Sequence, residues 1–147
     1  MRLKALPATY GITVVRVMSG IILVVASLEK FTAGGLFGFV GVVTNLGIVV
    51  PQFFGVFIPC LELIGGLMVL FGLGARWAAI LFVCEFFVNA VILKTPRQPP
   101  FGGWDSMRID LMLLAASISI VLVGPGALAL DGLLRRRPAG ALEPQYR

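Results

Sequence analysis

Two glutamates lie deep within long apolar stretches of the chain, where a charge costs at least ~2.5 kcal/mol without a partner or water. Glu62 comes eight residues after the start of one stretch at Phe54, and Glu85 comes eight residues before the end of the next at Leu93. At about 1.5 Å per helical residue, both lie roughly 12 Å from the same membrane surface. Two carboxylates at one depth can exchange protons with a bound molecule, so both are candidate catalytic residues.

Other polar residues could complete a binding site around this pair. Asn89 lies one helical turn beyond Glu85, and Lys30 belongs to a polar stripe at helical spacing in the first apolar stretch. The candidate cofactor-binding residues are Arg16, Lys30, Asn89, Arg108 and Asp110. The simpler interpretation is that these charges pair and hold the helices in register. The convergence of several charges on one depth favours a site.

Arg16 lies far from the other charges, about 22 Å from the outer membrane surface by the same helical rise. Its long side chain could reach the headgroups on the inner side, or it could turn inward and neutralise Glu62. The inward pairing is favoured because the stripe that contains Arg16 faces the interior of a helix bundle. Gly65 and Gly66 follow on the face of Glu62, where they permit close packing or leave room for a flat ligand.

The residues that usually hold redox centres are scarce in this chain. There are no histidines and two cysteines, Cys60 and Cys84. We therefore expect no haem, no iron–sulfur cluster and no metal site, because these need histidine or several cysteine ligands. Cys60 is two positions from Glu62 and points to the opposite side of its helix, so both cysteines are predicted to fill apolar space. Any electrons must come from a partner.

Composition indicates that these residues belong to an all-α, polytopic membrane protein. The chain has 147 residues, of which 59% are hydrophobic and 13% are charged, with a mean hydropathy of +1.00. Residues 1–134 are predicted to form an antiparallel bundle of four transmembrane helices, and residues 135–147 a basic cytoplasmic tail that is disordered by itself. The predicted spans are residues 12–31, 54–73, 77–93 and 109–123. Residues 36–50 are too broken to cross, so a short helix or re-entrant piece at the outer interface is predicted.

Glycine and proline mark the ends of the predicted helices. Gly72 and Gly74 predict a tight hairpin between the second and third spans. The sequence 124–126, Gly-Pro-Gly, ends the fourth span, and Asp105 or Ser106 is the predicted N-cap of that span.

The basic residues set the expected orientation. The net charge of +5 comes from 12 Lys and Arg against 7 Asp and Glu. Seven of the basic residues fall on the side of the termini and the hairpin, so both termini are predicted to face the cytoplasm. Topology thus explains the basic excess, and we expect the lipid bilayer rather than nucleic acid as the partner. Arg16 within the first stretch argues for an uncleaved span rather than a secretory signal.

Taken together, these features resemble the DoxX family of small bacterial and archaeal membrane proteins. The resemblance covers residues 16–134 and rests on three groups of residues: Arg16, Gly20 and Lys30; Glu62 to Gly66 with Leu70, Gly72, Leu73 and Arg76; and Gly124, Pro125 and Gly126 with Leu130 and Asp131. It implies a four-helix protein of the inner membrane, related to quinone-linked thiosulfate oxidoreductase subunits. Arg16, Lys30, Glu62 and Asp110 match motif positions. The lack of histidine departs from many relatives and weakens a borrowed proton-relay role.

Three functions follow as hypotheses. The first is a subunit or anchor of a quinone-linked redox system, in which Glu62 or Glu85 accepts protons and Lys30, Asn89 or Arg108 bonds a quinone carbonyl. As an enzyme, it would be an oxidoreductase subunit without its own redox centre, partnered by a larger membrane complex or a soluble redox enzyme. The second is a non-catalytic accessory subunit. The third, a small transporter, needs a wet path from Arg16 to Lys30, which a dry plug at Leu23 would close.

Overall fold

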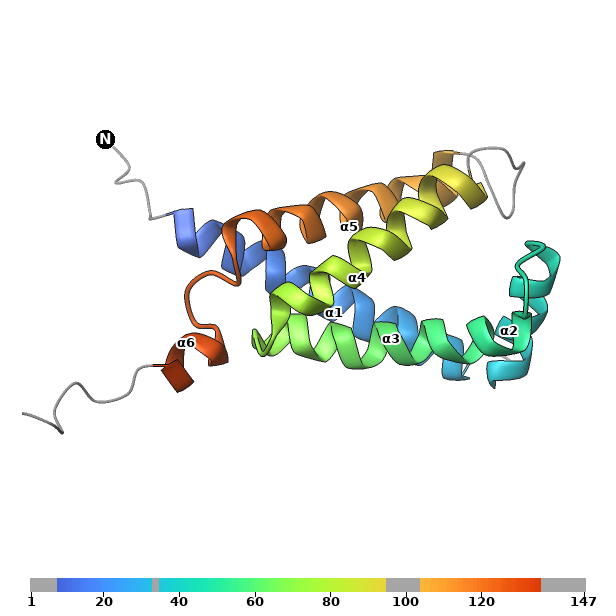
Figure 1. Cartoon of the computed structure of the whole chain (residues 1–147), viewed down its shortest axis with the longest axis horizontal. Coiled ribbons are helices and arrows are strands. Elements are labelled where there is room, and N and C mark those ends of the chain that lie inside the picture. Colours follow the sequence, from blue (N-terminus) through green and yellow to red (C-terminus); the bar gives the residue numbers. More distant parts are fainter. Residues whose placement is uncertain (1–7, 33–34, 95–103, 136–147) are drawn as a thin grey trace, which may run out of the picture.

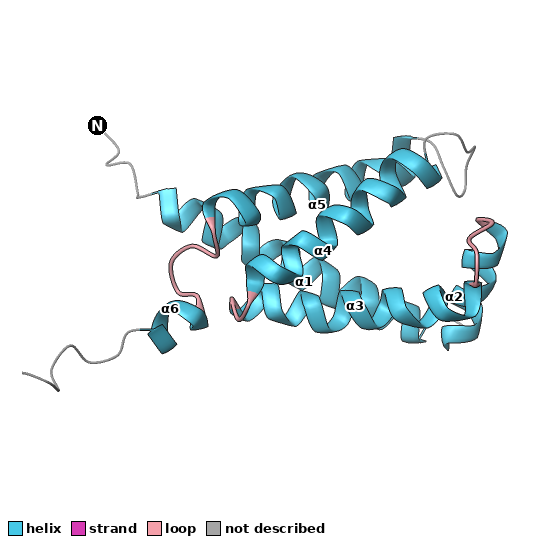
Figure 2. Cartoon of the chain, viewed as in Figure 1, coloured by secondary structure: helices cyan, strands magenta, loops and turns pink. Residues whose placement is uncertain are grey.

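The structure, a computed structural model, describes residues 8–32, 35–94 and 104–135, and within these ranges every regular element is helical (Figures 1 and 2). This confirms the all-α fold. The elements are α1 (Ala8–Thr32), α2 (Gly35–Asn45), α3 (Pro51–Phe71), α4 (Ala75–Phe87), a π-helix η1 (Val88–Lys94) that continues α4, α5 (Trp104–Val123) and α6 (Leu130–Arg135).

The long helices form two antiparallel pairs. Helix α1 packs along α3, and α4 packs along α5. The two pairs lie closest near the α3–α4 hairpin and separate toward the end of the bundle that carries α2 (Figure 1). We call this end of the bundle the α2 end, and the opposite end, with the hairpin and α6, the α6 end. Phe82 and Leu23 are among the largest fully buried side chains of the core.

Three helices of the described part are long and apolar enough to cross a membrane: Thr9–Thr32, Pro51–Phe71 and Ala75–Lys94. Helix α5, with 20 residues, lies at the predicted fourth span. The four predicted spans are therefore all helices. Large apolar side chains such as Met112 and Ile64 are exposed on their outer faces, as lipid contact requires.

Two glycines bring α1 and α3 into close contact. A Cβ on Gly20 would lie 2.8 Å from the backbone of Leu70, and a Cβ on Gly66 would lie 2.9 Å from Leu23 Cβ. Small residues at a helix crossing allow this approach, which increases van der Waals contact where no hydrophobic effect drives association. The close-packing role predicted as one alternative for Gly66 is thus the role that the structure gives it.

Several boundaries differ from the predicted ones. Helix α3 begins at Pro51 rather than Phe54, because proline fits the first helical turn, where its missing N–H is no loss. Helix α5 begins at Trp104, so the prediction that Asp105 or Ser106 is the N-cap is wrong. Residues 35–45 form a short helix, one of the two predicted alternatives, and this helix packs against α3. From residue 136 onward, the predicted tail lies outside the described residues.

The predicted hairpin between α3 and α4 is present and is held by α6. Gly72 and Gly74 adopt left-handed φ angles of 71° and 59°, which glycine tolerates without strain. The backbone N–H of Gly74 donates to Asp131 Oδ2 at 2.7 Å, and the N–H of Asp131 donates to the Gly72 carbonyl at 3.2 Å. Asp131 therefore fixes α6 against the hairpin.

Candidate functional site

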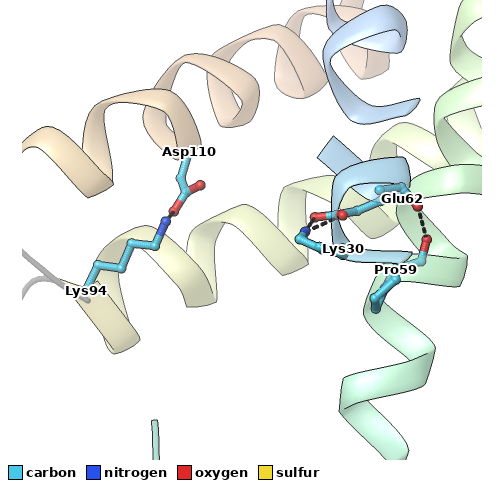
Figure 3. Close-up of polar contacts among 6 residues, drawn as sticks. Lys30, Pro59, Glu62, Lys94 and Asp110 are labelled. Carbon is cyan, nitrogen blue, oxygen red and sulfur yellow. Dashed lines mark hydrogen bonds and ion pairs between the residues drawn. The ribbon is translucent and has the colours of Figure 1, made fainter. Parts of the chain in front are cut away.

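An ion pair between Lys30 of α1 and Glu62 of α3 lies at the α2 end (Figure 3). Lys30 Nζ donates hydrogen bonds to both carboxylate oxygens. The Glu62 side chain is 5% exposed and that of Lys30 is 24% exposed, so the pair reaches the surface of the bundle through the lysine. Lys30 Nζ also lies 5.1 Å from the centre of the Phe39 ring in α2, a cation–π contact. This one ammonium group therefore connects α1, α2 and α3.

A second ion pair connects η1 to α5. Lys94 Nζ lies 2.6 Å from Asp110 Oδ2 (Figure 3). Sequence analysis included Asp110 among the site residues but not Lys94. A π-helix has more residues per turn than an α-helix, so ordinary helical spacing gives the wrong face for residues at the end of η1. The position of Lys94 at the end of an apolar stretch was the available signal.

Both side-chain oxygens of Glu85 in α4 are buried, and the described structure gives them no basic partner, whereas Glu62 and Asp110 each pair with a lysine. The carboxyl group of Glu85 instead interacts with that of Glu62. It lies within electrostatic range of Glu62, Lys30 and Asp110. Four helices thus contribute one charged residue each to a group that we call the charged cluster: Lys30, Glu62, Glu85 and Asp110.

A cleft of about 350 Å³ lies between α3 and the α4–η1 helix, beside the charged cluster. Glu85 and Asn89 are its polar lining residues, and the remainder is apolar, including Phe54, Ile58 and Leu61. Phe57 and Leu81 line it and are also exposed on the outer surface of the bundle. The cleft therefore opens on the outer surface of the bundle, and Glu85 is the member of the charged cluster that lines it.

Two predicted site residues lie away from the cleft. Arg16 is at the α6 end, 2% exposed, and donates to the Pro125 carbonyl at 2.9 Å and the Leu128 carbonyl at 3.4 Å. The expectation that Arg16 turns inward to neutralise Glu62 is wrong, because Lys30 occupies that carboxylate and the turn after α5 offers carbonyls to Arg16. Arg108 has an exposed side chain near the start of α5 and does not line the cleft.

Two hydrogen bonds made by side-chain hydroxyl groups were not predicted from the sequence. Ser27 Oγ donates to the Pro59 carbonyl at 2.7 Å, which adds a polar contact between α1 and α3 (Figure 3). Thr13 Oγ1 lies 2.8 Å from the Ala127 carbonyl and 2.7 Å from the Thr9 carbonyl. Their partners are backbone carbonyls, which every residue carries, so the sequence has no signal for the pairing.

Leu23 separates the charges at the two ends of α1. It is 2% exposed and belongs to the apolar core, between Arg16 at one end and Lys30 at the other. The transport hypothesis required a wet path between these two residues. A buried leucine at this depth counts against that path.

The chain is similar in sequence to known membrane proteins. Residues 11–95 match the family model described as DoxX. Over 121 residues, the chain is 36% identical to a Bacillus subtilis protein named "Putative oxidoreductase CatD", covering 82% of this chain and 84% of that protein. It is 28% identical over 133 residues to a Mycobacterium tuberculosis protein named as an uncharacterized membrane protein, covering 84% and 80%. No solved structure matches it. The chain belongs to the DoxX family of membrane proteins.

Proposed function

We propose that this protein is a membrane subunit of a redox system and that the cleft between α3 and α4 binds a quinone. The observation that carries the proposal is Glu85, whose buried carboxyl group has no basic partner in the described structure and interacts with the carboxyl group of Glu62. A buried carboxylate without a cation is costly, so its retention suggests a missing partner or a proton. The oxidoreductase name of the Bacillus subtilis relative supports the redox part of the proposal.

The cleft suits a flat, mostly apolar ligand. Its volume of about 350 Å³ lies within the range of small-molecule sites, roughly 300–1,000 Å³. Its opening toward exposed apolar side chains would let a lipid-soluble molecule enter from the membrane. Of the three residues expected to bond a quinone carbonyl, Asn89 lines the cleft, so we assign it that role.

The residues of the chain would handle protons. A bound quinone supplies the ability to carry two electrons and two protons. Asn89 orients the ring by donating to a carbonyl oxygen, and Glu85 takes up or releases a proton beside it. Glu62 and Lys30 lie next to Glu85 in the charged cluster, and the partly exposed Lys30 connects this cluster to water at the α2 end. Electrons come from a partner complex or a soluble redox enzyme.

We also propose that the protein lies in the inner membrane of a bacterium or archaeon with both termini in the cytoplasm. Seven Lys and Arg residues in the termini and the hairpin support this orientation. The α2 end, with the cleft and the charged cluster, then faces outward. A soluble electron donor acting from outside would meet this end first.

A binding and turnover experiment tests the proposal. The protein is purified in mild detergent, co-purifying molecules are identified, and a short-chain quinone is titrated by calorimetry. Asn89→Leu is expected to weaken binding at least tenfold. Glu85→Gln is expected to keep binding within a few-fold and to slow quinone reduction by the co-purified partner at least tenfold. Glu29→Gln, at an exposed carboxylate on α1, is the matched control. Binding no stronger than to empty micelles, or unchanged in Asn89→Leu, contradicts the proposal.

A non-catalytic accessory subunit is the second candidate. The observation that favours it is that Glu62 and Asp110 are each neutralised by a lysine on another helix, as charges that only hold helices in register would be. In that case Glu85→Gln leaves the turnover of the partner complex unchanged, while Glu62→Gln reduces the amount of complex that assembles. The turnover of the partner complex with Glu85→Gln therefore distinguishes the candidates.

A further inference from the structure

A polar pocket of about 730 Å³ lies at the α6 end, far from the cleft. Three elements form it: the start of α4, the end of α5, and the short helix α6. Its lining residues include Arg76, Trp77, Pro125, Asp131 and Gly132. None of these belongs to the proposed quinone site.

Among the described residues, none forms an ion pair with the arginine that lines this pocket. Arg76 is exposed, and the described structure gives its side chain no hydrogen bond or ion pair. Its guanidinium packs over Gly124, where a Cβ would lie 3.0 Å from Nη2. Asp131 is the acidic lining residue, and its Oδ2 already accepts the N–H of Gly74. Within the described part of the chain, Arg76 therefore remains available to an anion.

A second guanidinium lies behind the wall of the pocket. Arg16 is buried and donates to the carbonyl of Pro125, which lines the pocket. Its Nε is buried and has no hydrogen-bond partner in the described structure, and no carboxylate there forms an ion pair with it. The positive charges of Arg16 and Arg76 thus flank the Gly124–Pro125 turn, and Asp131 offsets one of them.

The pocket lies at the depth of lipid headgroups. The apolar helices α4 and α5 end here, at Ala75 and Val123. Trp77, beside Arg76, is 74% exposed, and tryptophan is enriched at the membrane–water interface. Ile80 and Val121 line the pocket on its membrane side, where acyl chains would continue from a headgroup.

We propose that this pocket binds the phosphate headgroup of an anionic phospholipid. Arg76 pairs with the phosphate, Trp77 packs against the glycerol backbone, and the buried charge of Arg16 adds a longer-range attraction. Basic pockets between transmembrane helices bind such headgroups in other membrane proteins. An acidic protein segment is less suited to the site, because it would have to enter among apolar side chains at membrane depth.

Native mass spectrometry of the purified protein tests the site with soluble dioctanoyl lipids. We expect dioctanoyl phosphatidylglycerol to bind at least tenfold more tightly than dioctanoyl phosphatidylcholine. Arg76→Gln is expected to remove this preference. Arg108→Gln, which removes the same charge from an exposed arginine at the opposite end, is expected to retain it. Each variant is first checked for an unchanged thermal midpoint.

A variant that fills the pocket provides an independent test. Gly132 lines the pocket, and a Cβ there would meet no atom within 4 Å, so Gly132→Leu begins a new side chain in open space; its thermal midpoint is checked against that of the wild type. It is expected to abolish the preference for phosphatidylglycerol. Equal binding of both lipids by the wild type, or retention of the preference in Arg76→Gln and Gly132→Leu, overturns the proposal. Displacement of the lipid by equimolar inorganic phosphate, or by an acidic peptide at lower concentration, contradicts a lipid as the ligand.

Discussion

Arg16 and Pro125 are 109 positions apart in the sequence, and the guanidinium of Arg16 donates a hydrogen bond of 2.9 Å to the carbonyl of Pro125. The same side chain reaches the carbonyl of Leu128, and Thr13, on the same helix, reaches the carbonyl of Ala127. The segment after α5 is therefore held to α1. At the opposite end of α1, Lys30 binds Glu62. A single helix thus makes a polar contact at each end of the bundle.

Replacement of Arg16 should destabilise the α6 end. In Arg16→Met the carbonyls of Pro125 and Leu128 lose their donors, and hydrogen bonds to charged groups contribute about 1.5–3 kcal/mol each. We expect the free energy of unfolding in mixed micelles to fall by about 2–4 kcal/mol. Titration with dodecyl sulfate measures it. Val15→Met, at an exposed neighbouring position, is the control. An unchanged midpoint in Arg16→Met would mean that the contact contributes nothing.

The Lys30–Glu62 pair should show energetic coupling. Removing one partner leaves the other charge partly buried, so Glu62→Gln and Lys30→Gln should each destabilise by about 1–3 kcal/mol. The double variant should lose less than the sum of the two, by at least about 1 kcal/mol. The same dodecyl sulfate titration gives all four free energies. Strict additivity would show that the two residues do not act as a pair.

Gly20 and Gly11 offer a matched test of packing within one helix. A Cβ on Gly20 would clash with the backbone of Leu70, whereas a Cβ on Gly11 would meet nothing within 4 Å. Gly20→Ala should therefore cost about 1–3 kcal/mol, because α1 and α3 must separate. Gly11→Ala should be neutral or stabilise by up to about 1 kcal/mol through helix propensity. Thermal denaturation followed by circular dichroism compares them, and equal effects would refute the close approach.

Leu23 provides a test of transport. Wild-type protein in liposomes should not raise proton permeability, because Leu23 closes the path between the two ends of α1. Leu23→Ala should destabilise the bundle by about 1–3 kcal/mol through lost contacts, whereas Ile22→Ala, at an exposed position, should have little effect. Decay of a pH gradient, reported by an entrapped dye, measures permeability. Rapid decay with the wild type would restore the transport hypothesis.

Much of the fold could be predicted because lipid exposure leaves a strong pattern in the sequence. The helices at the four predicted spans follow from apolar stretches in the sequence, and the turn between α3 and α4 follows from Gly72 and Gly74. The depths of Glu62 and Glu85 were also predictable, because helical rise converts sequence position into distance. The structure places both residues in the charged cluster.

The missed features share a physical cause. The pairing of Lys94 with Asp110 depends on a π-helical turn, and no residue type marks that turn. The partners of Arg16 are backbone carbonyls, so its position could not be deduced from complementary side chains. The sequence instead favoured a carboxylate partner for Arg16, because residue types indicate complementary side chains and not backbone acceptors.

The contact between Arg16 and the turn after α5 bears on how the protein is made. Arg16 is translated more than a hundred residues before its acceptors Pro125 and Leu128. At about 5–20 residues per second, the guanidinium waits roughly 5–20 s for them. During that interval its charge must stay with headgroups, water or the insertion machinery. A nascent chain released before Gly124 lacks these acceptors, so the charge of its Arg16 continues to depend on headgroups, water or the insertion machinery.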